Sequence, residues 1–454
     1  MRQIKYSLAI LSAVAVLAGC GGSGSGSNTT GDQTLKVKYS AQISFGDSLS
    51  DVGTYAVGTV KALGGGKFNI NGNNVGVNPA LTGKNWTELM AAQLGLPAPC
   101  PAQTGLDGDA AHGFSVPVVN HAGCFGYAQG GARVTNPVGP GNKYTGSALG
   151  SLTVPVATQI KNHLAIAGGK FKADELVFVM AGANDAFIQL GQLSAGATAA
   201  GQAKFGSTLV GLLAAGATNP ATAAQAIGIA MATESARAGH TDATVVGAAV
   251  FAAATQPGNA AVGAQAVYGP MVATATTAGQ NAGAAYAATN GPVVIAAMGT
   301  AGAELVALVK TQILANGATH VVVNNLPDLA MTPFGLSQSA ETQALISAMN
   351  KTFNDQLSSG LSGEANVVLV DAFSVNHDQA TNPGPYGLTN VKTPACDLTA
   401  AKNPLGSSLV CNASNLISGD ISHYLFSDTV HPTPYGQWLL ARYTTERLVV
   451  KGWM

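Results

Sequence analysis

This sequence has little charge. Only 9% of its 454 residues are Asp, Glu, Lys or Arg, and the formal net charge is -1. Proteins that bind nucleic acid or strongly acidic partners usually carry a basic patch, which so few cations cannot supply. Aromatic residues are also scarce, at 6%, whereas glycine reaches 57 residues. We therefore expect no nucleic-acid partner, and the composition favours apolar or lipidic ones.

Cysteine is scarce too, and the first of the five stands apart from the others. A basic start is followed by an apolar stretch from Leu8 to Ala18 and then by Gly19-Cys20. This pattern is typical of a secretory signal and not of a membrane span, and no transmembrane run is expected after residue 18. Leu-Ala-Gly-Cys at 17–20 also resembles the bacterial lipobox, in which the cysteine carries a lipid.

The lipobox resemblance implies an N-terminal organisation for the chain. Residues 1–19 would be a lipoprotein signal peptide, and Cys20 would be the lipidation site. Residues 20–35 are rich in Gly, Ser, Asn and Thr, which predicts a flexible tether. The protein would be exported and anchored by lipid to the cell envelope, at the outer membrane because Gly21 and not an aspartate follows the cysteine.

Four further cysteines remain, namely Cys100, Cys124, Cys396 and Cys411. An even number in an exported protein predicts two disulfides, but four cysteines allow three pairings. Our hypothesis pairs the sequence neighbours, Cys100 with Cys124 and Cys396 with Cys411. Cysteine and histidine spacings typical of zinc sites are absent, so we expect no metal.

Residues 36–454 show apolar stretches that alternate with helical patterns. We expect strands at 41–45, 116–120, 175–181, 319–325 and 366–371, and helices at 86–95, 303–315 and 347–361. Continuous apolar strands that alternate with helices indicate a parallel sheet covered on both faces. The fold class predicted is therefore α/β, a three-layer αβα sandwich with about five parallel strands. Its ligands would bind at the carboxyl ends of the strands.

Residues 191–300 break this alternation. Nearly half of them are Ala or Gly, and Lys204, Glu234, Arg237 and Asp242 are the only charged residues. Alanine favours helix, so we expect a helical insertion in the domain. Two roles stay open: a packing pad of small-residue helices, or a lid or acyl-binding cap beside the site.

The first motif with chemical potential follows the strand at 41–45. The strand runs into Gly46-Asp47-Ser48, and a sharp turn there would expose the serine hydroxyl at the edge of a sheet, as a nucleophile requires. The Gly-x-Ser-x-Gly pentapeptide of α/β-hydrolases is not met, because Ser50 follows Leu49. A turn whose serine caps the next helix is the alternative.

The second motif lies near the carboxyl end. Asp428 precedes His431 by three residues, so a single turn can bring the carboxylate to one ring nitrogen while the other faces a serine. Asp420 and His423 form a rival pair with the same spacing.

Together these motifs resemble the SGNH, or GDSL, hydrolase family. Gly-Asp-Ser-Leu at 46–49, a glycine after the second strand, Asn184 in Gly-Ala-Asn-Asp, and Asp428 with His431 occur in the family's order. The resemblance extends from about residue 40 to the carboxyl end, apart from the insertion, and it implies a flavodoxin-like sheet.

Carried over, the resemblance makes Ser48 the nucleophile, His431 the general base and Asp428 the residue that orients His431. The oxyanion hole would combine the Ser48 N–H, a glycine N–H and the Asn184 amide. We favour Gly131 over Gly130, by spacing from the position where the family often has Asn, which is Gly126 here.

The resemblance thus predicts an esterase or lipase that acts on acyl esters or lipids and needs no cofactor. A carbohydrate acetylesterase is the nearest alternative, and acyl transfer is another. A non-catalytic, surface-binding lipoprotein on the same scaffold is an alternative from a different class.

Overall fold

A computed structural model describes residues 35–72 and 81–454, of which residues 36–454 form one compact unit. The predicted signal peptide, the lipidation site Cys20 and almost all of the tether lie outside the described residues.

The core of the unit is a parallel sheet of four strands. They are β1 (Ala41–Gly46), β4 (Glu175–Met180), β5 (His320–Asn324) and β6 (Val367–Val370), in the order β1-β4-β5-β6. Every residue of β4 is buried, as expected for an inner strand with helices on both faces. The α/β class and these four strands confirm the prediction, and their carboxyl ends lie along one edge of the sheet.

The predicted second strand does not join this sheet. Residues of β3 (Ser115–Asn120) pair antiparallel with β2 (Gln103–Asp107) in a separate two-stranded sheet, and most β3 side chains are exposed. On the other side of β1, within the part of the chain that the structure describes, one isolated parallel bridge joins Ser44 and Gly126. The expectation of about five parallel strands was therefore wrong: a stretch of backbone around Gly126 occupies the place that we gave to 116–120.

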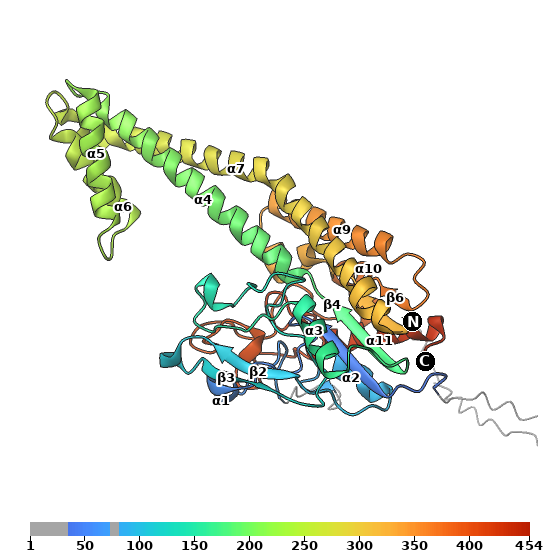
Figure 1. Ribbon diagram of the computed structural model, residues 1–454. Helices are drawn as coiled ribbons and strands as arrows, with labels where there is room; N and C mark the ends of the chain where they lie inside the picture. The colour runs from blue at the N-terminus through green and yellow to red at the C-terminus, as the bar shows by residue number, and fades with distance from the viewer. Residues whose placement is uncertain (1–34, 73–80) are drawn as a thin grey trace, which may run out of the picture. The chain divides into compact units, whose positions relative to one another are not determined.

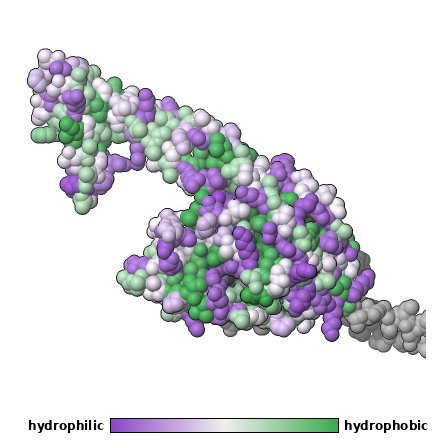
Figure 2. Space-filling view, viewed as in Figure 1, coloured by the Kyte–Doolittle hydropathy of each residue, from purple (hydrophilic) through white to green (hydrophobic). Residues whose placement is uncertain are grey.

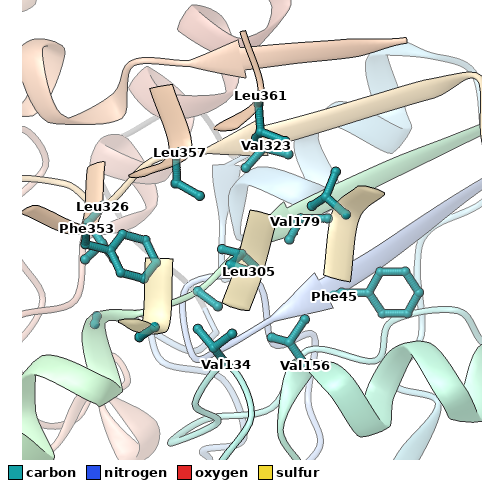
Figure 3. Packing of buried hydrophobic residues seen from close by; sticks show 14 of the residues in the cluster. Phe45, Val134, Val156, Val179, Leu305, Val323, Leu326, Phe353, Leu357 and Leu361 are labelled. Carbon is teal, nitrogen blue, oxygen red and sulfur yellow. The ribbon is translucent and has the colours of Figure 1, made fainter. Parts of the chain in front are cut away.

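Alternate strand residues enter two different hydrophobic clusters. Phe45, Val179 and Val323 pack with side chains of α3 (Val156–Ile166), α7 (Gln265–Leu308) and α9 (Ala340–Gly360), as Figure 3 shows for one part of that cluster. Phe178 and Val322 pack instead with α2 (Trp86–Gln93) and α11 (Pro434–Lys451). Helices therefore cover both faces of the sheet. The remaining short helices are α1 (Gly58–Ala62), α8 (Pro333–Leu336) and α10 (Ala372–Thr381).

The insertion is helical, as predicted, but its helices extend beyond 191–300. It consists of α4 (Ala183–Ala214), α5 (Pro220–Ser235), α6 (Asp242–Ala254) and the long α7, and α4 and α7 run side by side (Figure 1). A Cβ added to Gly279 would lie 2.9 Å from the Gly201 carbonyl oxygen. Only glycine permits this close approach of the two backbones, which accounts for part of the glycine content.

The two ends of the insertion pack differently. Near the sheet, Leu193, Val294 and Met298 belong to the main core. Further along α4, Leu209 and Leu213 form a separate cluster with α5 and α6 residues such as Ile227 and Ala253. The first part thus packs against the main core, as a packing pad would, and the second part has a small core of its own.

One helical stretch contradicts our expectation of no membrane-length run after residue 18. Gln265–Asn316 is long and apolar enough to cross a membrane by length and hydropathy alone. Its carboxyl-terminal half packs against α9 and the sheet core, a position that also produces such a composition. On the face seen in Figure 2, hydrophilic and hydrophobic residues are intermixed along the insertion helices.

Candidate active site

The turn after β1 positions the candidate nucleophile. Gly46 has a φ of 154°, and a Cβ there would collide with the carbonyl oxygen of Met180 on the neighbouring strand. Glycine therefore lets β1 turn sharply against β4. The Asp47 carboxylate accepts the Leu49 N–H at 3.1 Å, which holds Ser48 at the end of β1.

The structure brings Ser48, His431 and Asp428 together. The Ser48 Oγ and the His431 Nε2 are 2.8 Å apart although 383 residues separate them in sequence. The His431 Nδ1 lies 2.8 Å from Asp428 Oδ2. The rival His423 is elsewhere, with its Nδ1 3.0 Å from the Ser422 hydroxyl and its ring against Tyr435.

Asp428 is buried and surrounded by donors. Its carboxylate accepts the backbone N–H groups of Ser408 at 2.8 Å, Val430 at 2.9 Å and His431 at 2.8 Å. Burial by itself would raise the pKa of Asp428, but the charge and hydrogen bond of His431, together with the other donors, outweigh it and bring the pKa well below its ordinary value. Asp428 therefore stays ionised and can orient the imidazole.

The described residues contain two disulfides, one of which lies next to this arrangement. Cys396 pairs with Cys411, with Cα atoms 6.0 Å apart, next to the turn at Ser408–Val410 that supplies a donor to Asp428. Cys100 pairs with Cys124, with Cα atoms 5.0 Å apart. The pairs join sequence neighbours, as in our hypothesis.

The backbone donors near Ser48 separate the two glycines that sequence spacing left open. The Gly130 N–H donates to Asp51 Oδ2 at 2.9 Å and is occupied. In the described part of the chain, no protein acceptor takes the N–H of Gly131 or of Ser48. Asn184 gives one amide hydrogen to the Ala132 carbonyl at 2.8 Å and keeps a second. Ser48, Gly131 and Asn184 all line one cavity, so the geometry favours Gly131 as a donor.

That cavity has a volume of about 510 Å³ and is mostly apolar. Its walls include Met180, Phe187, Leu329, Val375, Phe426 and Leu440. Between Phe187 and Pro327 no residue lines it, so the 191–300 insertion contributes no side chain. This position supports the packing pad and not the lid or acyl-binding cap.

Two contacts at the site were not anticipated from the sequence. The Phe68 ring lies 4.9 Å from the His431 ring, between centroids, and Ser408 binds Asp428 through its backbone. An aromatic residue in a Gly- and Asn-rich loop was a weak signal for Phe68. A backbone donor leaves no side-chain signal, so Ser408 could not have been found.

Asp47 is the other unusual ionisable group here. Complete burial raises its pKa to about 7, and this effect is only partly offset by the Leu49 N–H and the charge of His431. As for metals, no three His, Cys, Asp or Glu side chains within residues 35–72 and 81–454 lie close enough together to hold an ion.

Residues 300–444 match the family described as GDSL-like lipase/acylhydrolase. The matched segment contains Asp428 and His431. Ser48 and Asn184 lie before this segment in the sequence, and the fold places them around the same cavity as His431.

Individual relatives match over similarly short segments. Esterase EstA from Pseudomonas aeruginosa and from Pseudomonas putida are each 34% identical over 138 residues, which cover 28% of this chain and 19% of each relative. A GDSL esterase/lipase from Arabidopsis thaliana is 27% identical over 143 residues, covering 29% of this chain and 38% of that protein. The chain thus spans about a fifth of the bacterial relatives. These matches support the assignment of the chain as a GDSL-type hydrolase that acts on esters.

Proposed function

We propose that the protein is a carboxylic ester hydrolase with Ser48 as nucleophile, His431 as general base and acid, and Asp428 as the residue that orients His431. The observation that carries this proposal is the 2.8 Å contact between Ser48 Oγ and a His431 ring whose other nitrogen is held by Asp428. A serine is a weak nucleophile until such a base accepts its proton.

The reaction then has two halves. Ser48 Oγ attacks the ester carbonyl while His431 Nε2 takes the hydroxyl proton, and collapse of the tetrahedral intermediate passes that proton to the departing alcohol. In the second half, His431 Nε2 takes a proton from water while the water oxygen attacks the acyl-serine carbonyl. Collapse of this second tetrahedral intermediate breaks the bond to Ser48 Oγ and releases the carboxylic acid, and His431 returns the proton to Ser48 Oγ. Asp428 remains ionised and stabilises the imidazolium in both halves.

The negative charge on the carbonyl oxygen needs donors that are already in place. The N–H groups of Ser48 and Gly131 and the free hydrogen of the Asn184 amide are such donors on the wall of the cavity. Each fixed donor of this kind is worth roughly 2.7–4 kcal/mol when it is deleted.

The cavity supports acyl esters or lipids as substrates over sugar acetates. Sugar hydroxyls need many hydrogen-bonding side chains, whereas the walls here are mainly aliphatic and aromatic, with a minority of polar side chains such as Ser147, Asn376 and Gln379. An acyl chain would place its methylene groups against those walls, at a gain of about 0.8 kcal/mol for each one buried.

We also propose that the protein is an exported lipoprotein anchored through Cys20. The signal-like pattern before Cys20 supports this, and so do the two disulfides, which persist in oxidising compartments. Cells fed a clickable palmitate analogue should label the wild type but not Cys20→Ser. Equal labelling of both would exclude Cys20 as the anchor.

The test of the activity is hydrolysis of p-nitrophenyl esters from acetate to palmitate by a soluble form that starts at Gly21. We expect turnover that Ser48→Ala abolishes, and fluorophosphonate labelling of the wild type alone. A preference for longer chains would select lipase over acetylesterase. A folded protein that neither hydrolyses any ester nor takes the label would refute the enzyme and favour the binding lipoprotein.

A further inference from the structure

A buried ion pair lies directly behind the candidate oxyanion hole. Arg133 Nε donates to Asp185 Oδ1 at 2.8 Å, and only 12% of the Arg133 side chain and 5% of the Asp185 side chain are exposed. Asp185 Oδ2 accepts the Val134 N–H at 3.1 Å. The proposed mechanism uses neither residue. Burying two charges has a desolvation cost in free energy unless their geometry offsets it, so the pair calls for a structural explanation.

The Arg133–Asp185 pair joins the two chain segments that carry the Gly131 N–H and the Asn184 side-chain amide. Arg133 and Val134 follow Gly131 in the loop, and Asp185 follows Asn184 in the first turn of α4. A further bond, from the Asn184 amide to the Ala132 carbonyl at 2.8 Å, crosses the same boundary. Three contacts between adjacent residues therefore fix the distance between the Gly131 N–H and the Asn184 amide.

The same two loop residues, Arg133 and Val134, are also held by α3. The first turn of α3 donates the Val156 N–H to the Arg133 carbonyl at 3.0 Å and the Ala157 N–H to the Val134 carbonyl at 3.1 Å. With α3 on one side and α4 on the other, the loop cannot shift without breaking several bonds. Among the described residues, the Arg133–Asp185 pair is the one hydrogen-bonded connection between the loop and α4 that two side chains make. It can therefore be removed while the N–H groups of Ser48 and Gly131 remain in the chain.

Charge gives the pair a second role. The Asp185 carboxylate is near enough to the nucleophile turn to raise the pKa of Asp47. A lone negative charge there would also disfavour the negative oxygen that forms during ester attack. Burial raises the pKa of Asp185 above its ordinary value, and Arg133 offsets part of that rise. With its guanidinium 2.8 Å from the carboxylate, Arg133 opposes the field of a charged Asp185 at the nucleophile turn.

We propose that Arg133 and Asp185 are positioning residues, which lock the Gly131 loop to the start of α4 and neutralise the charge behind the oxyanion hole. This role rests on the proposed ester hydrolysis. It predicts that loss of the pair affects stabilisation of the transition state and leaves substrate binding largely intact.

The experiment compares Arg133→Met, Arg133→Lys, Asp185→Asn and the double variant Arg133→Met with Asp185→Asn. Each is assayed for kcat and KM on a p-nitrophenyl ester, with active sites counted by fluorophosphonate titration so that kcat refers only to competent Ser48. Arg237→Met is the matched control, since Arg237 forms an exposed pair with Glu234 in the insertion, away from the cavity.

For Arg133→Met we expect kcat per titrated site to fall about 10²-fold, the loss typical of a misplacement near 1 Å, with KM nearly unchanged. Arg133→Lys should recover at least about tenfold of this, because it restores the charge. The kcat per site of the double variant should exceed that of Arg133→Met, because the double variant has no lone carboxylate. It should stay about tenfold below the wild-type value because the connection between the loop and α4 is missing. Arg237→Met should equal wild type.

Unchanged kcat per site in Arg133→Met would overturn the positioning role, and so would a loss that appears only in the number of active sites. Should Arg133→Met fail to fold, the double variant decides, and wild-type kcat in it would equally overturn the role. An inactive, unlabelled wild type would instead refute the proposed function itself.

Discussion

The exchange of Asp428 for Asn examines the core of the proposed mechanism. The two carboxylate oxygens have different partners: Oδ1 accepts the N–H groups of Val430 and His431, whereas Oδ2 accepts the Ser408 N–H. An asparagine in this place has one oxygen only. It should keep that oxygen toward the two N–H groups and turn its NH₂ toward Ser408 and the His431 ring.

The consequence is a change of tautomer. An NH₂ group that donates to His431 Nδ1 forces the ring proton onto Nε2, which then cannot accept the proton of Ser48. Trapping the wrong tautomer in this way costs about 10⁴-fold in kcat in a well-studied Ser-His-Asp enzyme. The Ser408 N–H also loses its acceptor, which should lower the free energy of unfolding by roughly 1–3 kcal/mol.

The assay is p-nitrophenyl ester hydrolysis with kcat and KM determined separately, beside urea unfolding. Asp420→Asn is the matched control, because Asp420 precedes His423 by the same spacing but that histidine does not contact Ser48. We expect wild-type kcat in the control. A kcat for Asp428→Asn within about tenfold of wild type would refute the assigned role of Asp428.

Three further changes have defined outcomes. Asn184→Ala should lower kcat by about 10²–10³-fold with little change in KM; a change in KM alone would remove Asn184 from the oxyanion hole. Burial raises the pKa of Asp47 from 3.8 to about 7, so its stabilising contribution is complete below pH 3.8 and is lost as the pH rises through 7. Asp47→Asn should therefore flatten the fall in unfolding free energy between about pH 4 and 7. Equal pH dependence of the unfolding free energy in both proteins, from urea curves, would contradict this. Removing the disulfide with Cys396→Ala and Cys411→Ala, which are 15 residues apart, should cost about 3 kcal/mol of stability and also lower kcat. An unchanged melting temperature would count against the first effect.

The sequence predicted the elements that carry their own periodicity. The strands at 175–181, 319–325 and 366–371 were found because a short, continuous apolar run in an α/β protein is typical of a strand buried on both faces. The strand at 116–120 is shorter and contains Pro117, which cannot donate to a sheet ladder, and it pairs antiparallel at the surface. Its place in a sheet depends on distant partners, which no local pattern encodes.

Site residues divide in the same way. Residues with distinctive side chains in short motifs, such as Ser48 and His431, could be singled out, and the fold brings them within 2.8 Å. The choice between Gly130 and Gly131 depends on which N–H Asp51 occupies, and the donor to Asp428 is a backbone group at Ser408. Such roles follow from three-dimensional contacts and not from residue type.

The insertion illustrates how a large addition can leave a site intact. Asn184, Asp185 and Phe187 occupy the first turns of α4, where bonds to the neighbouring loop fix them. Beyond Phe187, no residue of α4 reaches the cavity, so the helix can continue along its axis without moving the residues at its start. The return helix α7 packs on α9, behind the sheet, and again adds no residue to the cavity. Residues added beyond the anchored start of α4 therefore alter the surface of the protein without contributing to the candidate site.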